Sequence, residues 1–498
     1  MSLIREAGVS QIVQFTVPYN GTWNSVAANM LSPDTLYQSS NVYIRKGKLR
    51  NRPGLLLLNN TEFSDPVIGG AMAVTPTDKI MLAVTRRALY TLGQSDTVWS
   101  VDTAAPFAGG DHSPVDITFL ETSSQYVAVI ANSLGEMHRW IQGNRAVTIS
   151  GSPAAKSVCT AARRIIALVA PHTIQWTSIL SYTDWPALAV VRVAQTNDVG
   201  ICVRSLGTLT FVIYKERSIY IARAQAGSDA NGFNIQFVQH VEGPAGVHAV
   251  VDVLGTHMYM TKNGRVGIFD GTSQVQWIAD GLWLHLQGDI DPTYSYKMFG
   301  VFDYRLHTVT FYYPRVTDTD GQMTGMVVIN MPLIGSNVQA PSAFLGVSSL
   351  PCSYATEMRF NDQIDKSITF SYQGNTGHSY AVDEDTVLDG TESYNCVAQT
   401  GLYPLPDMKH YQLSVEPFLE RLDGYGSVNL YSVVSDALEN ETGDIQYANG
   451  TLLDLNSSQV TEYVGFNTPC RFFGLRYEWP STSKVRYAGC SLYGRVLV

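Results

Sequence analysis

The chain has few cysteines and no long apolar run, and each shortage excludes a class of protein. Its 6 cysteines are scattered over 498 residues without a Cys-x-x-Cys pair, so the sequence indicates neither a zinc site nor a dense disulfide framework. No stretch approaches the roughly 18 apolar residues of a transmembrane helix. Residues 1–14 lack the apolar core of a signal peptide. We therefore expect a protein without an integral membrane segment, made in a cytoplasm.

The sequence also lacks the motifs of common enzymes. Its 10 histidines never occur at a ligand spacing such as His-x-x-x-His, and neither a Gly-x-Ser-x-Gly elbow nor a glycine-rich phosphate loop is present. A glycosidase propeller needs two carboxylates that face one cleft, and no such pair can be placed. Residues 318–321 (Asp-Thr-Asp-Gly) resemble the start of a calcium loop, but its twelfth position is Ile329, so a hairpin turn is the better interpretation. We expect no catalysis, no cofactor and no metal site.

Charge is scarce and mostly negative. Charged residues make up 15% of the chain, against roughly 25% in a typical soluble domain, and the formal net charge is -10. Tight wrapping of nucleic acid needs many Lys and Arg contacts to phosphate, so this balance argues against it, while passing contact with a polyanion is still allowed. The low charge predicts a surface that is largely polar and neutral, or covered by neighbouring subunits.

One short segment, residues 41–54, reverses this balance; we call it the basic hairpin. Two short alternating runs flank Gly47, and Pro53-Gly54 ends the pattern, which predicts a hairpin. Five of the 33 basic residues lie within eight positions here: Arg45, Lys46, Lys48, Arg50 and Arg52. Such cations often only solvate an exposed strand. The functional alternative is contact with an acidic surface of another subunit or with DNA phosphate.

The densest acidic cluster lies far along the chain, and we call residues 383–392 the acidic loop. It contains Asp383, Glu384 and Asp385, followed by Asp389 and Glu392. Such a cluster binds a cation, repels a polyanion at a channel wall, or is simply a solvated loop.

Helical periodicity is scarce, and short apolar runs are broken every ten residues or so by turn residues, which predicts an all-β chain. From about residue 66 to 385 a unit recurs: an apolar strand, a polar tight turn and an amphipathic strand. Residues 79–85 with 88–92, and residues 256–261 with 265–271, are two examples. The units start roughly 40 to 60 residues apart, the period of a four-stranded propeller blade.

We predict an irregular β-propeller of six or seven blades at residues 61–400, because a ring of blades packs each sheet on two neighbours and leaves few free edges. Several sandwich domains with similar hairpins are the alternative. Beyond the linker-like Tyr403-Pro-Leu-Pro-Asp, residues 401–498 have the pattern of a C-terminal β-sandwich. Residues 1–60 are predicted to form an irregular N-terminal arm that includes the basic hairpin.

Several segments match, in order, those of a known family. They are Asn29-Met-Leu-Ser-Pro-Asp, the segment from Ser40 to Gly54, Ile174-Gln-Trp-Thr-Ser with Tyr182-Thr-Asp-Trp, Val241-Glu-Gly-Pro-Ala-Gly-Val, Val266-Gly-Ile-Phe-Asp-Gly and Gly489-Cys-Ser-Leu-Tyr-Gly. In layout, over nearly its whole length, the chain resembles the tail nozzle proteins of short-tailed bacteriophages, also described as packaged-DNA stabilisation or tail accessory proteins.

The resemblance implies a propeller-bearing homohexamer in the virion tail, assembled in the host cytoplasm, without enzymatic activity. Its neighbours would be the adaptor (head-to-tail connector) and tail fibre or spike proteins, and its channel would retain genomic double-stranded DNA until ejection. An acidic wall suits this role because it repels a duplex; six copies at -10 each would give about -60. The basic hairpin is then expected to anchor the subunit to its neighbours, with DNA contact second. The alternative function is a carbohydrate-binding or glycan-cleaving propeller that contacts the bacterial surface.

Overall fold

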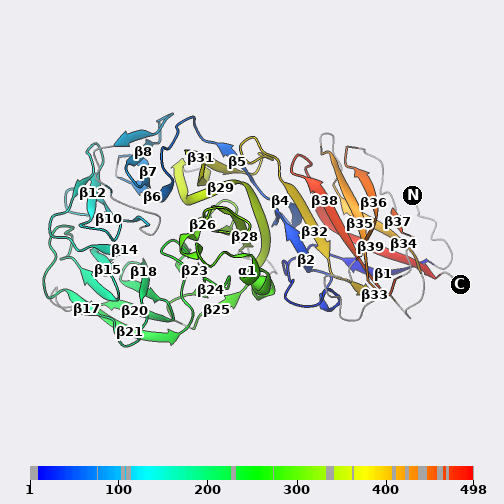
Figure 1. Ribbon diagram of the computed structural model, residues 1–498, viewed down its shortest axis with the longest axis horizontal. Helices are drawn as coiled ribbons and strands as arrows, with labels where there is room; N and C mark the ends of the chain where they lie inside the picture. The colour runs from blue at the N-terminus through cyan, green and yellow to red at the C-terminus, as the bar shows by residue number, and fades with distance from the viewer. Residues whose placement is uncertain are drawn as a thin grey trace.

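The computed structural model describes residues 9–75, 77–102, 107, 114–225, 232–272, 274–331, 341–361, 364–405, 411–420, 425–435, 446–456, 464–466 and 470–496. In these ranges the chain is nearly all β and has two parts, a ring of small sheets and a pair of larger sheets beside it (Figure 1). The predicted all-β class, with a propeller followed by a C-terminal sandwich, is confirmed.

Five sheets of the ring are four-stranded blades in which consecutive strands pair antiparallel. Their strands are β6 (Val67–Val74), β7 (Lys79–Thr85), β8 (Leu89–Gly93) and β9 (Ser100–Asp102); β10 (Asp116–Glu121), β11 (Tyr126–Ala131), β12 (His138–Ile141) and β13 (Val147–Thr148); β14 (Ala155–Ala161), β15 (Arg164–Val169), β16 (Thr173–Trp176) and β17 (Val190–Arg192); β18 (Gly200–Ser205), β19 (Thr210–Lys215), β20 (Ser218–Ala224) and β21 (Phe233–His240); and β22 (Val250–Val253), β23 (Thr256–Met260), β24 (Val266–Phe269) and β25 (Gln276–Ile278). The second strands, such as β7 and β11, are buried along nearly their whole length because each blade packs on neighbours at both faces.

The last two blades share one seven-stranded sheet. It runs β26 (Phe299–Asp303), β27 (Thr308–Tyr313), β28 (Met323–Asn330), β29 (Ser342–Asn361), β30 (Ile364–Gln373), β31 (Thr376–Asp383) and β5 (Gly54–Leu57). Strand β29 has 20 residues; its first half pairs with β28 as the outer strand of blade six, and its second half pairs with β30 as the inner strand of blade seven. Five four-stranded blades and these two give seven, within the predicted range.

The ring is closed by a strand from before the first blade. Strand β5 pairs with β31 and completes blade seven, and β6 packs beside both β10 and the inner half of β29. Apolar side chains fill the spaces between blades; Leu82 and Val84 of blade one, for example, share a cluster with Ala128 and Ile130 of blade two. Strand β5 thus covers the outer edge of β31 and gives blade seven its fourth strand.

A polar network lines part of the propeller axis. Arg204 on β18 donates to Asp116 on β10 at 2.7 Å and to the Val247 carbonyl at 2.5 Å. Ser157 on β14 donates to the same Asp116 carboxylate at 2.6 Å. A cavity of about 320 Å³ adjoins these groups. The network ties together the inner parts of four successive blades.

Next to the axis, His257 on β23 lies buried between two hydrogen-bond partners. Its Nε2 donates to the Ser205 carbonyl at 2.7 Å, so its Nδ1 accepts from the Tyr214 hydroxyl at 2.9 Å. Burial lowers the pKa of His257 to about 4, and burial likewise lowers the pKa of His248 to about 4. Both histidines are therefore neutral in the folded protein at neutral pH.

This predicts an acid-sensitive fold. Between about pH 6.5, where an unfolded histidine titrates, and pH 4, the unfolded chain binds protons that the folded chain does not. The free energy of unfolding should therefore fall on acidification through this window, by up to about 1.4 kcal/mol per pH unit for each histidine. Urea denaturation at several pH values measures the slope. His257→Gln should reduce the slope of the free energy of unfolding against pH by the contribution of one titrating group. An unchanged slope in that variant would contradict the assignment.

The sandwich combines both ends of the chain. One sheet contains β1 (Val9–Phe15), β3 (Val42–Arg45), β4 (Lys48–Asn51), β34 (Tyr411–Leu419), β37 (Val464–Phe466) and β39 (Arg486–Val496); the other contains β2 (Leu36–Ser40), β32 (Asn395–Thr400), β33 (Tyr403–Pro404), β35 (Ser427–Ser435), β36 (Gln446–Asp454) and β38 (Phe472–Pro480). Phe15, Val42 and Leu49 enter the same core as Leu413 and Phe473.

The domain limits thus differ from the predicted ones. The described residues up to 51 are not an irregular arm but contribute strands to the sandwich, and β32 joins it before residue 401. The remaining elements are short: the 3-10 turns Ala28–Met30, Asp280–Leu282 and Ser295–Lys297, and helix α1 (Trp283–Asp289). In the ranges described, no helix has the length and apolar character needed to cross a membrane.

Candidate functional site

The basic hairpin is formed as predicted. Strands β3 and β4 pair antiparallel, with Val42 opposite Asn51 and Arg45 opposite Lys48. The two turn residues both have positive φ, 52° at Lys46 and 70° at Gly47, which is the turn geometry that matches the twist of a hairpin. The tip therefore presents Lys46 to solvent. Strand β3, at the edge of its sandwich sheet, contacts β28 and β29 of the propeller.

Arg52, the last cation of the basic hairpin, is buried where the two domains meet. Its guanidinium forms a bidentate ion pair with Asp389 of the acidic loop, at 2.9 and 2.5 Å, and both side chains are almost fully buried. Its Nε donates to the Asn41 side chain at 2.8 Å, and the guanidinium stacks 3.9 Å from the ring centre of Tyr394. Burial alone would lower the pKa of Arg52, but the Asp389 carboxylate more than offsets this, so the pair stays charged.

A second ion pair joins the same two segments. Arg45 donates to Glu384 at 2.7 Å, and the Tyr43 hydroxyl donates to the same carboxylate at 2.9 Å. Burial, with the negative charge of Glu384, raises the pKa of Tyr43 well above its usual range. The basic hairpin thus supplies the cation of both ion pairs with the acidic loop, Arg45 with Glu384 and Arg52 with Asp389.

The rest of the acidic loop faces its own blade or solvent. Asp383 accepts from Lys366 on β30 at 2.5 Å; burial raises its pKa, but the hydrogen bond from Lys366 outweighs that and leaves the pKa below its usual value. Asp385 is exposed. Contact of these residues with a channel lumen or a cation stays a prediction.

The other cations of the hairpin have different surroundings. Lys48 pairs with Glu420 of the sandwich, which Arg486 also contacts at 2.8 Å. Arg50 is half-buried, and among the described residues its Nε has no hydrogen-bond partner. Arg45, Lys48 and Arg52 are therefore paired within the chain, which leaves Lys46 and Arg50 as the better candidates for the predicted contact with another subunit or DNA.

Two asparagines complete the junction, and sequence reasoning missed both. The Asn330 side chain donates to the Ile44 carbonyl at 2.6 Å and accepts from the Ile44 amide at 3.3 Å, so it extends the pairing of β3 to the end of β28. Asn41 accepts from the Val347 amide of β29 at 2.8 Å. An asparagine at the end of a strand does not by itself indicate a contact between domains, because asparagine is also common in turns.

Residues 318–321 belong to the connection between β27 and β28, in line with the turn interpretation. Asp318 accepts from the Thr324 hydroxyl at 2.7 Å and from the Arg315 amide at 2.9 Å. Within the part of the chain that the structure describes, no three His, Cys, Asp or Glu side chains gather as metal ligands would.

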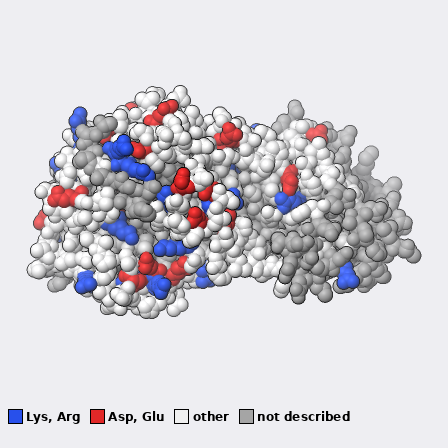
Figure 2. All heavy atoms as spheres, viewed as in Figure 1, with Lys and Arg blue, Asp and Glu red and all other residues white. Residues whose placement is uncertain are grey.

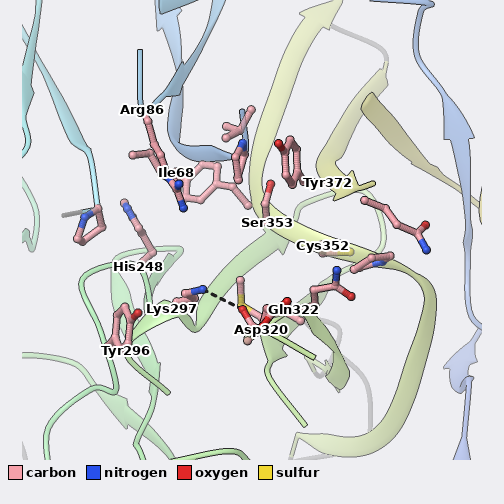
Figure 3. A pocket seen from close by; sticks show the side chains of 18 of the residues that line it. Ile68, Arg86, His248, Tyr296, Lys297, Asp320, Gln322, Cys352, Ser353 and Tyr372 are labelled. Atoms are coloured by element: carbon pink, nitrogen blue, oxygen red, sulfur yellow. Dashed lines mark hydrogen bonds between the residues drawn. The ribbon is translucent and has the colours of Figure 1, made fainter. Parts of the chain in front are cut away.

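A cavity of about 360 Å³ is lined mainly by blades one, six and seven, with Pro114 and His248 from the segments before blades two and five (Figure 3). Arg86, in the turn between β7 and β8, reaches into it from blade one, and Lys297 reaches into it from the turn before β26. The Lys297 ammonium donates to the Asp320 carbonyl at 3.3 Å, as the dashed line in Figure 3 marks. Nothing in the sequence distinguishes Arg86 from its neighbour Arg87, because both are simply turn residues there.

On the face drawn in Figure 2, acidic and basic side chains are interspersed over the propeller, and uncharged residues cover most of it. This agrees with the low content of charged residues. Where the described residues cover this face, basic side chains form no broad surface of the kind that binds a polyanion tightly.

Comparison with known proteins identifies no family. No protein-family model matches the chain, and no curated protein matches it. Similar solved structures include U3-55K, at 7% identity over 66% of this chain and 99% of that one, with a TM-score of 0.42. They also include Chaetomium thermophilum Raptor, at 9% identity over 67% of this chain but 29% of that one, with a TM-score of 0.44. The third is BBS1N, solved in complex with ARL6DN, at 9% identity over 67% and 99%, with a TM-score of 0.41. Likenesses this distant carry no argument about what the chain does.

Proposed function

We propose that this chain is a structural subunit of the virion tail of a short-tailed bacteriophage, a nozzle or hub without enzymatic activity. It works as a homohexamer below the portal and adaptor, retains the packaged DNA and guides its ejection into the host. The layout of the sequence supports this assignment through its resemblance to tail nozzle proteins.

The observation that carries the proposal is the junction at Arg52. Domains joined by a small polar interface move relative to each other, whereas a nozzle that holds back a packed genome has to keep its shape. The buried pair of Arg52 with Asp389, and the pair of Arg45 with Glu384, fix the sandwich against blades six and seven. A subunit of fixed shape is what a closed ring requires.

The DNA channel, in this proposal, lies between subunits and not along the axis of one propeller. Arg204 and Asp116 line that axis, and the cavity there, of about 320 Å³, is far too small for a duplex. A ring of six chains encloses the bore, and the net charge of -10 on each copy keeps its wall repulsive to phosphate.

Lys46, at the exposed tip of the basic hairpin, and the half-buried Arg50 on β4 supply the contact with the adaptor or an adjacent tail protein. The test is charge reversal of Lys46 and Arg50, which spares the ion pairs of Arg45, Lys48 and Arg52 within the chain. Phage carrying Lys46→Glu with Arg50→Glu should assemble few tails, or yield heads that lose DNA to added nuclease. A matched control, Arg87→Glu with Lys262→Glu, reverses two exposed charges on the propeller. Normal particles from the hairpin variant would rule out this docking role.

Electron microscopy of the purified protein or of the native particle tests the larger proposal. A ring with a central bore, located in the tail, is the expected image. A monomer that releases sugar from bacterial capsule would contradict it and would favour a glycan-cleaving propeller.

A further inference from the structure

The outer strand of blade four differs from those of the other four-stranded blades. Strands β9, β17 and β25 have three residues each and β13 has two, whereas β21 has eight. Very short outer strands, charged side chains and prolines are the usual means by which proteins keep sheet edges from pairing with other chains. Strand β21 reads Phe-Asn-Ile-Gln-Phe-Val-Gln-His, without Lys, Arg, Asp, Glu or Pro. Among the described residues it is the last strand of its sheet, so its outer edge has no partner there.

The direction of the backbone groups at this edge follows from the pairing with β20. The Gln225 amide donates to the Gly232 carbonyl at 3.0 Å, so the hydrogen-bonded pairs of this antiparallel ladder continue at Asn234 and Gln236. The register shift falls at Val238, after them. Three alternate residues consequently direct their backbone groups away from β20: Phe233, Ile235 and Phe237. Groups at this spacing pair with an extended backbone, so the chemistry of the edge calls for a β-strand.

The sandwich has a comparable edge in β36. This strand has nine residues and is also last in its sheet among the residues described. The Leu455 amide donates to the Gly426 carbonyl at 2.8 Å, so by the same alternation Leu452 and Asp454 direct their backbone groups away from β35. Leu452 is 64% exposed and Tyr447 is 52% exposed. Strand β1, another long edge of the sandwich, exposes no large apolar residue among those whose side chains are described.

The two edges fit each other in an antiparallel register. With Ile235 opposite Leu452, residues whose backbone groups point outward face each other along both strands. The exposed side chain of Leu452 then lies beside Ile235 and diagonal to Phe237, which is 41% exposed, on one face of the joined sheet. The only charged residue on either strand is Asp454, so no like charges oppose the contact.

The partner of each edge has to come from a second copy of the chain. Figure 1 shows β21 on the outer rim of the propeller and β36 in the sandwich, too far apart to pair within one molecule. Pairing between copies is therefore head to tail, and each added copy leaves one edge free until the assembly closes.

We propose that β21 of one copy pairs with β36 of the next copy, so that one continuous sheet crosses each contact between subunits. This inference deepens the homohexamer proposed above and rests on that proposal only for the number of copies. It also gives an uncharged surface of the chain a neighbour to cover it.

Size-exclusion chromatography with light scattering on the purified full chain tests the contact. Ile235→Pro removes an outward amide and leaves the pairing with β20, since an edge strand tolerates proline at such a position. It should weaken association by about tenfold or more, and Leu452→Pro should do the same from the other strand. Val190→Pro is the matched control, because Val190 also directs its amide outward but lies on the short outer strand β17. It should change association less than about twofold.

A mixture of the two proline variants identifies the partner edge. Ile235→Pro keeps an intact β36, and Leu452→Pro keeps an intact β21, so together they should form a one-to-one pair and nothing larger. If β21 paired with β21 of another copy instead, Leu452→Pro would associate as the unmodified chain does. That result would overturn the proposal.

Three other results would also overturn it: the unmodified chain is monomeric throughout the micromolar range, Ile235→Pro associates unchanged, or Val190→Pro weakens association equally. Circular dichroism checks that Ile235→Pro is folded, and Phe237→Lys, which places a charge at the same edge, provides the test if it is not. The outcome is separable from the nozzle proposal. An open filament or a ring of another size that both proline variants disrupt would support the strand pairing and contradict the hexamer.

Discussion

Replacing Arg52 with methionine is expected to lower the free energy of unfolding by about 3–5 kcal/mol. The change removes a bidentate partner from Asp389, whose side chain is fully buried. Among the described residues, the carboxylate would keep only its hydrogen bond from the Ser349 amide at 2.9 Å. Asn41 and Tyr394 would lose the guanidinium as well. The penalty comes mainly from an unpaired buried charge, which costs far more than the lost pair itself contributes.

Urea denaturation followed by tryptophan fluorescence measures this loss. The control is Arg45→Met, because the pair of Arg45 with Glu384 is partly exposed and should cost less than about 1 kcal/mol. Adding Asp389→Asn to Arg52→Met should restore part of the stability, since it removes the stranded charge. If Arg52→Met unfolds within about 1 kcal/mol of the unmodified protein, the junction is not the rigid connection that we infer.

Replacing Asp116 with alanine is expected to be similarly costly, about 3–5 kcal/mol, and to act on the propeller. Asp116 accepts from Arg204, from the Ser157 hydroxyl and from the Val158 amide at 2.9 Å. Without it, the partly buried Arg204 guanidinium has no carboxylate at hydrogen-bond distance among the described residues. The blades that meet at the axis would lose their common acceptor.

Thermal unfolding of Asp116→Ala, followed by circular dichroism, measures this effect. Asp252→Ala is the control: Asp252 also borders the axial cavity, but it is exposed and caps only the turn at Gly255, so its loss should cost about 1 kcal/mol or less. Arg204→Met combined with Asp116→Ala should be more stable than Asp116→Ala alone. Equal stability of the two alanine variants would show that the axial network contributes nothing.

The sequence predicted those elements whose signal is local. Apolar strands, tight turns and amphipathic strands recur because each blade buries the same faces, so the ring follows from the repeat. The blade number stayed at six or seven for a physical reason: β29 passes from blade six to blade seven without a turn, and β5 comes from outside the repeats. Neither the continuous strand β29 nor the closing strand β5 produces a periodic pattern in the sequence.

The N-terminal strands were missed because their partners are distant. Strand β1 pairs with β39 and β2 pairs with β32, and strands this short have no recognisable pattern without their neighbours. The basic hairpin, in contrast, was visible because its alternation and Gly47 are local features.

For the candidate sites, residue types were visible but their partners were not. The opposite charges of the basic hairpin and the acidic loop could be read from the sequence, yet more than 300 residues separate Arg45 from Glu384, and only the fold brings them together. The same applies to Arg86 and Lys297, which line one cavity only because the ring closes.

The interleaving of the two domains has a consequence for synthesis of the protein. A ribosome releases β1 to β4 early, but β39, the strand that β1 and β4 pair with, is the last one made. At about 5–20 residues per second, the interval from residue 51 to residue 486 lasts roughly 20–90 s. During that time β1 and β4 lack their partner β39, while the strands of the propeller are synthesised. Translation therefore supplies every strand of the ring before it supplies β38 and β39 of the sandwich, so β1, β2 and β4 wait for partners that are synthesised hundreds of residues later.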